Sequence, residues 1–274
     1  MTRRKIVPVT EGGTGLVTSG ALGNILTSDG TNWTSAAPAS QLPQGFTGSL
    51  TRRSFYIQPA VGMASLSSVI TLGAGTVGLV VTPFGGVSPI GQIQQGYSVI
   101  NLTTPAAADD RVYLYQGPSD VNKPIRRDLL PTIGYLVVPS TTANVRVAFG
   151  LADDNNPSDL LTSSTPGSTN SAETVAFMYD TAASNTTWRC ITSNTTTQTN
   201  TNSLVTFTAG TAYRLYIDML TAGSVKFYID GSLVATHTTN IPAATTHLGV
   251  FEGINSLTAS AATIYIGRVA GESN

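Results

Sequence analysis

The sequence has few charged residues. Lysine, arginine, aspartate and glutamate make up 11% of the 274 residues, whereas roughly a quarter is usual in soluble domains. The formal net charge is -1 at pH 7, so the chain lacks the positive field that holds a polyanion, and nucleic acid is not an expected partner. Threonine, serine, asparagine and glycine replace the missing charges, which predicts a neutral, hydroxyl-rich surface built from strands and turns.

Cysteine and long apolar runs are also nearly absent. The single cysteine, Cys190, excludes an intramolecular disulfide and a multi-cysteine metal site. Stability must therefore come from packing or from association with other chains. No apolar run is long enough to span a membrane, and none follows Met1 as a secretory signal would require. We expect a protein made in the cytoplasm, with no membrane span.

Helical periodicity is missing too, and strand alternation takes its place. In residues 213–219 apolar and polar side chains alternate, which predicts a strand with one buried and one wet face. The wet face is expected to carry Arg214, Tyr216 and Asp218. Residues 225–229 repeat the pattern, and Asp230-Gly231 offers the positive φ angles of a tight turn into a third strand. These segments predict an antiparallel meander.

Further alternating segments complete an all-β pattern. They occupy residues 77–83, 97–104, 111–117, 133–139, 145–151, 174–180, 187–193, 247–254 and 262–270. Turn-forming residues separate them, and no segment has the pattern of a crossover helix. We therefore predict an all-β fold in which residues 52–274 form one antiparallel two-sheet sandwich.

The first 51 residues differ in kind. Pro8, Pro38 and Pro43 interrupt any ladder, and the apolar side chains are scattered along an extended path. Such a segment either stays disordered or completes a core with other chains. We expect association, and assign residues 1–51 to an extended adaptor.

Two blocks in this adaptor carry a resemblance. Gly12-Gly13-Thr14-Gly15 is followed by GNILTSDGTNW at residues 23–33. The pair resembles the adaptor segment near the particle-proximal end of bacteriophage tail fibres, head fibres and other virion appendage proteins. The resemblance implies an assembly and docking role for Gly12, Gly13, Gly15, Leu22, Ile25, Leu26, Asp29, Gly30 and Trp33.

The side chains of the adaptor favour assembly independently of this resemblance. Asp29-Gly30 predicts a hairpin turn between Leu26 and Trp33. Trp33 is one of 2 tryptophans, and a tryptophan is costly to leave in water. In a homotrimer, Trp33 and its apolar neighbours from each chain would meet at the axis and form a shared core. The alternative is a flexible linker with Trp33 packed on the following domain.

The remainder carries a second resemblance. NTTWRCITSN, FTAGTAYRLYIDM, SVKFYIDGSLVATHTTNIP and TIYIGRV are together similar to the concanavalin A-like jelly rolls of laminin G and pentraxin type, which occur on phage particles. The likeness covers at least residues 187–269 and implies an antiparallel jelly-roll β-sandwich. It implies no particular function, because this fold serves lectins, hydrolases and structural modules alike.

Catalytic residues are not evident. The Glu-x-Asp-x-x-Glu string of laminarinase-type relatives is absent, Glu11 and Glu272 are expected in tails, and Asp218 is expected on the solvent face. With 2 histidines, any nucleophilic triad would be accidental. We therefore expect the chain not to be an enzyme.

Two residues of one strand are expected in the core. Trp188 and Cys190 alternate with polar neighbours, which indicates packed side chains; the alternative for Trp188 is a sugar-stacking platform.

One loop is rich in oxygen ligands. Calcium favours carboxylate and amide oxygens, and Asp153, Asp154 and Asp159 lie together in ADDNNPSD. The alternative is ordinary turn chemistry, because the spacing matches no dedicated calcium loop. No other cofactor is expected.

Together these features predict a structural virion protein. It would form a homotrimer, dock on other virion proteins through residues 1–51, and project a sandwich that recognises host surface glycan, with avidity from three copies. Alternatives are a stand-alone carbohydrate-binding module and a polysaccharide-degrading enzyme.

Overall fold

The computed structural model describes residues 25–28, 33–36, 53–57, 79–83, 90–94, 96–116, 123, 125–153 and 173–273. By its internal contacts the chain divides into two compact units, Met1–Thr47 and Gly48–Asn274. Within the described ranges no helix is long and apolar enough to cross a membrane.

The first unit contains a short antiparallel pair. Strand β1 (Ile25–Ser28) pairs with β2 (Trp33–Ala36), and Ser28 lies opposite Trp33. This pairing places a hairpin where Asp29-Gly30 predicts one.

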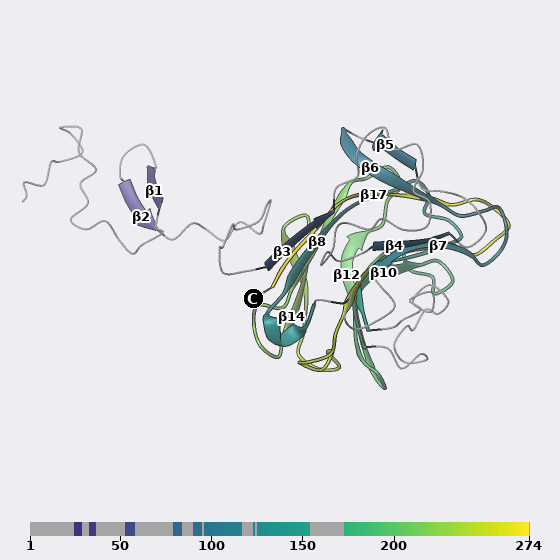
Figure 1. Ribbon diagram of the computed structural model, residues 1–274. Coiled ribbons are helices and arrows are strands. Elements are labelled where there is room, and N and C mark those ends of the chain that lie inside the picture. The colour runs from purple at the N-terminus through teal and green to yellow at the C-terminus, as the bar shows by residue number, and fades with distance from the viewer. Residues whose placement is uncertain are drawn as a thin grey trace, which may run out of the picture. The chain divides into compact units, whose positions relative to one another are not determined.

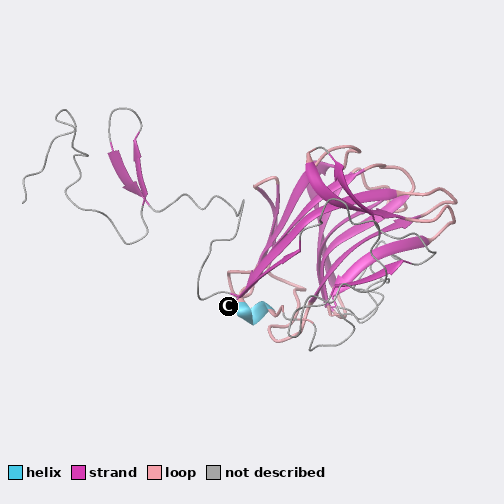
Figure 2. Cartoon of the chain, turned by 45° about the horizontal axis from the view of Figure 1, so that its top comes forward, coloured by secondary structure: helices cyan, strands magenta, loops and turns pink. Residues whose placement is uncertain are grey.

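The second unit contains two antiparallel sheets, shown as two layers of strands in Figure 2. Sheet 1 has the strand order β15-β14-β13-β8-β17-β6-β5, and β3 pairs with β17 beside this path. Its strands are β3 (Arg53–Ile57), β5 (Ile90–Gln94), β6 (Tyr97–Thr103), β8 (Thr132–Pro139), β13 (Tyr213–Asp218), β14 (Val225–Ile229), β15 (Ser232–His237) and β17 (Thr263–Ser273). The helical turn η3 (Arg127–Leu129), cyan in Figure 2, leads into β8.

Sheet 2 has the order β12-β11-β10-β9-β16-β7-β4. Its strands are β4 (Leu79–Pro83), β7 (Asp110–Gln116), β9 (Val145–Ala152), β10 (Glu173–Asp180), β11 (Thr187–Asn194), β12 (Gln198–Thr206) and β16 (Gly249–Ser256). In Figure 1, β8 and β14 of sheet 1 lie to the left of β7 and β10 of sheet 2. The predicted all-β antiparallel sandwich is confirmed.

The core lies between the inner faces of the two sheets. Trp188 is fully buried at its centre, with its ring 4.8 Å from that of Phe207 and 5.6 Å from that of Tyr213. Because Tyr213 belongs to sheet 1 and Trp188 to sheet 2, these aromatic contacts join the layers. Trp188 and Cys190 are therefore core residues, as predicted, and burial raises the pKa of the Cys190 thiol.

A buried histidine closes one side of the sandwich. His237, at the end of β15, contacts Thr192 Oγ1 through Nδ1 and Thr201 Oγ1 through Nε2, both at 2.9 Å. Burial lowers the pKa of His237 to about 4, so the ring is neutral at pH 7. The side chain thus links sheet 1 to the edge strand β12 of sheet 2 and to its neighbour β11.

Strand β12 is one that the sequence pattern does not identify. Its residues are mostly threonine, asparagine and glutamine, so no apolar face marks it as a strand. The strand forms because β11 offers a ladder partner and its threonines bond across the side of the sandwich. Thr197, just before it, donates to Asn240 at 2.7 Å, and Asn240 in turn donates to Thr199 at 3.1 Å.

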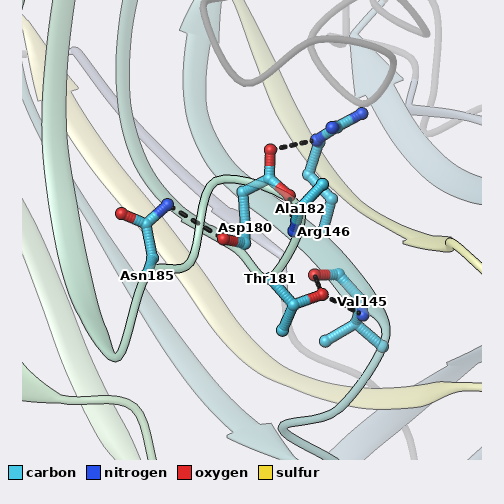
Figure 3. A network of polar contacts seen from close by, with 6 residues as sticks. All are labelled: Val145, Arg146, Asp180, Thr181, Ala182 and Asn185. Atoms are coloured by element: carbon cyan, nitrogen blue, oxygen red, sulfur yellow. Dashed lines mark hydrogen bonds and ion pairs between the residues drawn. The ribbon is translucent and has the colours of Figure 1, made fainter.

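A buried polar network holds the turn between β10 and β11, as Figure 3 shows. Arg146 Nε donates to Asp180 Oδ2 at 2.7 Å, and Asp180 Oδ1 accepts the backbone N–H of Ala182 at 2.8 Å. Asn185 Nδ2 donates to the Asp180 carbonyl at 3.0 Å. Asp180 is fully buried and Arg146 is 5% exposed, so this ion pair is structural.

Candidate functional site

Most of the predicted docking residues lie outside the residues that the structure describes. Ile25 and Leu26 lie in β1, and Trp33 begins β2. Gly12, Gly13, Gly15, Leu22, Asp29 and Gly30 lie outside the described residues. Their role in assembly stays a prediction.

Of the predicted calcium ligands, only Asp153 is described. Its Oδ1 accepts the backbone N–H of Glu173 at 2.8 Å, and its carbonyl accepts a bond from the ammonium of Lys123, which is 1% exposed. Asp154 and Asp159 lie outside the described residues. Within the part that the structure describes, no three histidine, cysteine, aspartate or glutamate side chains gather in a metal-binding group.

The outer face of sheet 2 is closed to solvent over its described middle strands. Ala148, Ala152, Tyr113 and Phe251 form a second apolar cluster there, and each is at most 3% exposed. A ligand that approaches from solvent therefore has no access to these side chains.

The outer face of sheet 1 is more open and carries aromatic side chains. We call its residues Tyr97, Arg214, Tyr216, Lys226 and Tyr228 the tyrosine face. The alternation of β13 and β14 turns Leu215, Ile217 and Phe227 into the core and four members of the tyrosine face outward, while the fifth, Tyr97, comes from β6. Arg214 is exposed, and the other four are half-buried.

Tyr216 and Tyr228 form a pair at the centre of this face. They lie directly opposite each other in the β13–β14 ladder, and their ring centroids are 5.9 Å apart at an interplanar angle of 53°. On its other side Tyr216 lies over Gly134 of β8, where an added Cβ would come 3.5 Å from Tyr216 Cδ2. Residue 134 is a glycine, so β8 places no side chain beside the Tyr216 ring at this position.

Arg214 extends across the sheet from the same strand. Its Nη2 donates to the Tyr97 hydroxyl at 3.1 Å, although Tyr97 lies on β6, on the far side of β8 and β17. The guanidinium is thus fixed over the middle of the sheet, one row away from the tyrosine pair.

A carboxylate lies at the other end of the tyrosine face. Asp218 is opposite Lys226 in the ladder and accepts the backbone N–H of Leu220 at 2.7 Å. Burial, and then the charge of Asp218, raise the pKa of Tyr228, which keeps the Tyr228 hydroxyl protonated as a donor.

The structure corrects the expected exposure of two acidic residues. Asp218 was predicted on a wet face, but it is 8% exposed because it turns back to bond its own chain. Glu272 was predicted in a tail, but it pairs opposite Thr132 within β17 and is also 8% exposed.

These groups combine a stacking surface with oriented hydrogen-bonding groups. Tyrosine rings pack on the C–H faces of sugars, while hydroxyl, guanidinium and ammonium groups bond sugar oxygens. Sequence alternation identifies Arg214, Tyr216 and Asp218 on one face, and by the same rule Lys226 and Tyr228. Tyr97 is missed because its place beside Arg214 depends on the order of strands in the sheet.

Comparison with known proteins identifies the fold. A family model described as the C-terminal domain of SO2946-like proteins matches residues 158–267. No curated protein matches the chain significantly. A Shewanella oneidensis MR-1 protein of unknown function, SO2946, is 15% identical, with a TM-score of 0.51 over 80% of this chain and 86% of its own.

Two enzymes of known structure are similar in fold. The endo-β-1,4-glucuronan lyase of the fungus Trichoderma reesei is 13% identical, with a TM-score of 0.51 over 80% of this chain and 95% of its own. The β-glucanase of Bacillus licheniformis is 12% identical, with a TM-score of 0.50 over 81% and 98%.

These likenesses correct the expectation that the chain is not an enzyme. That expectation depended on the absent Glu-x-Asp-x-x-Glu string and on the presence of only 2 histidines. Both argue against particular catalytic arrangements and not against catalysis in general. A lyase and a glucanase share the fold, so the fold is compatible with an enzyme. What the comparisons show is the architecture itself, a concanavalin A-like jelly-roll β-sandwich of the glucanase type.

Proposed function

We propose that the sandwich binds polysaccharide along the tyrosine face. The observation that carries this proposal is the pair Tyr216 and Tyr228, half-buried and side by side on an outer sheet face, with Gly134 of β8 beside the Tyr216 ring. Arg214 and Lys226 supply donors on either side of the pair along the strands. The jelly-roll fold shared with a glucuronan lyase and a β-glucanase supports a glycan ligand by analogy.

The setting that we propose is a virion appendage. The adaptor resemblance in residues 12–33 supports docking on other virion proteins, and the paired strands β1 and β2 agree with the hairpin that this adaptor requires. A trimer would present three tyrosine faces, so that weak binding at each face sums to useful avidity on a host surface glycan.

The test is binding by the full-length protein to a panel of soluble polysaccharides, measured by affinity electrophoresis and calorimetry. Replacing Tyr216 with alanine removes half of the stacking pair, so we expect binding to at least one polysaccharide to weaken by about 10-fold or more, roughly 1.4 kcal/mol. Tyr216→Phe keeps the ring and should retain most of the affinity.

Leu204→Ala is the matched control, because Leu204 is 83% exposed and lies on sheet 2. Unchanged binding by Tyr216→Ala would refute the tyrosine face as the site. The same mixtures should be assayed for new reducing ends and for unsaturated products, since either would show that the bound polysaccharide is also cleaved.

A further inference from the structure

We propose that the tyrosine face is specific for acidic polysaccharides, and that Arg214 binds the carboxylate of a uronic acid residue. This inference rests on the proposed function, because it names the chemical class of the ligand at the same site. Four observations about Arg214 support it: the hydrogen bond of its guanidinium, the side of β13 toward which the guanidinium extends, the residues in the same row of the sheet, and its distance along the strand from Tyr216.

The guanidinium is positioned by a hydrogen bond, and no described carboxylate forms an ion pair with it. Its Nη2 donates to the uncharged hydroxyl of Tyr97 at 3.1 Å, and within the described part of the chain Arg214 forms no ion pair. A guanidinium has five N–H donors, so this bond leaves most of them for a ligand. A planar fork with free parallel donors matches a carboxylate in a bidentate arrangement.

The carboxylate of Asp230, just after the adjacent strand β14, bonds the backbone of Arg214 and not its guanidinium. Asp230 Oδ1 accepts the backbone N–H of Arg214 at 2.9 Å, so its charge lies on the β14 side of β13. Tyr97 lies on the opposite side, beyond β8 and β17. Because the Arg214 side chain reaches toward Tyr97, its guanidinium points away from Asp230 and keeps its attraction for an external anion.

A second arginine lies in the same row of sheet 1. The β8–β17 ladder shifts register between Ile266 and Val269, which places Gly267 and Arg268 opposite Leu136. Leu136 fills the space that a side chain at Gly267 would need, since an added Cβ would come 2.7 Å from Leu136 Cδ2. The row from Arg214 to β17 is thus an apolar floor between two cationic residues, Arg214 and Arg268.

The spacing suits one sugar residue with its carboxylate. Arg214 and Tyr216 are two positions apart on β13, which corresponds to roughly 7 Å along the strand. A pyranose ring stacked on Tyr216 can therefore direct a carboxylate substituent toward the guanidinium in the next row. A neutral sugar would make the same contact with the Tyr216 ring but would lack the ion pair with Arg214.

Nonspecific attraction does not explain such a preference. The chain carries a formal net charge of -1 at pH 7, so its overall field repels a polyanion weakly. Selectivity for acidic polysaccharide would have to come from local groups.

The experiment compares two oligosaccharides of equal length, a β-1,4-glucuronan and a neutral β-1,4-glucan, by calorimetry on the full-length protein. We expect the acidic oligosaccharide to bind about 10-fold or more tightly at low salt, and this advantage to shrink as salt increases. Arg214→Gln should remove the advantage while affinity for the neutral oligosaccharide stays within about 2-fold.

Arg189→Gln is the matched control because it makes the same change of charge on sheet 2, where Arg189 donates to Asn200 at 2.8 Å. It should keep the acidic preference. If Arg214→Gln also keeps it, or if both oligosaccharides bind the unaltered protein equally while Tyr216→Ala weakens both, the acidic specificity is overturned and the proposed function stands. If neither oligosaccharide nor any other polysaccharide binds, the proposed function fails as well.

Discussion

At the scale of single residues, Glu252 is a side chain that is costly to bury in the sandwich. It lies on β16 between Val250 and Ile254, opposite Phe149 and Leu114, so it points into the core. It is 1% exposed, and neither carboxyl oxygen has a hydrogen-bond partner among the described residues. Burial raises the pKa of Glu252 to about 8, so the side chain is mostly protonated at neutral pH.

This burial predicts a loss of stability toward alkaline pH. The unfolded chain releases the Glu252 proton near pH 4.5 and the folded chain only near pH 8. Between these values the unfolded state binds fewer protons, so the free energy of unfolding falls as pH rises, by on the order of 3–5 kcal/mol from this one group.

Glu252→Gln keeps the shape and removes the proton equilibrium. We therefore expect the variant to lose less stability than the unaltered protein between about pH 5 and about pH 8, when urea unfolding is followed by circular dichroism. Parallel pH profiles for the two proteins would contradict this account of Glu252.

At the scale of elements, the Arg146–Asp180 network of Figure 3 joins β9, β10 and the turn after β10. Asp180→Asn keeps the acceptor for the Ala182 N–H but removes the charge that neutralises Arg146. Removing the charge of one partner of a buried ion pair costs about 3–5 kcal/mol. We expect the midpoint of urea unfolding to fall accordingly, with an unchanged slope.

The matching control removes both charges. Asp180→Leu combined with Arg146→Met replaces the ion pair with apolar groups, so the double variant should be more stable than Asp180→Asn alone. If it is less stable, the hydrogen bond from Arg146 contributes more than its desolvation costs.

The elements also show what sequence can predict. Alternation identified twelve strands, because apolar residues recur at every second position in much of each: β4, β6, β7, β8, β9, β10, β11, β13, β14, β15, β16 and β17. The Asp230-Gly231 turn is confirmed, with φ angles of 49° and 85° and a two-residue loop between Ile229 and Ser232. Strand β12 was not predicted, since polar side chains that pair at an edge leave no apolar signal.

The tyrosine face was predictable only in part. The pairing of Tyr216 with Tyr228 follows from alternation and a short hairpin, which are both local. The bond between Arg214 and Tyr97 joins residues far apart in the chain, and the burial of Asp218 depends on how its side chain turns. The first depends on the order of strands in the sheet, and the second on a side-chain turn that alternation alone does not indicate.

At the scale of the whole molecule, the prediction concerns association. If residues 1–51 form a trimeric adaptor, full-length protein should have three times the mass of one 28.4 kDa chain in size-exclusion chromatography with light scattering. Trp33→Ala should weaken or abolish the trimer, because the tryptophan supplies much of the apolar area that an adaptor of this composition can bury.

Trp33→Phe retains an aromatic ring and should keep the trimer at higher protein concentration. A full-length protein that is monomeric across the accessible concentration range would refute the adaptor role. Its circular dichroism would still report the sandwich, so loss of association is distinguishable from loss of fold.

Asp153 and Glu173 are joined by two hydrogen bonds, which bear on how much sequence change the segment between them can accept. The N–H of Asp153 donates to the Glu173 carbonyl at 3.1 Å, and the N–H of Glu173 donates to the Asp153 side chain at 2.8 Å. Two hydrogen bonds therefore hold the end of β9 beside the start of β10. Replacing residues 154–172 with a foreign sequence would leave these two bonds in place. The entropic cost of closing the new loop would grow only with the logarithm of its length. We therefore expect the sandwich to tolerate different sequences between residues 153 and 173.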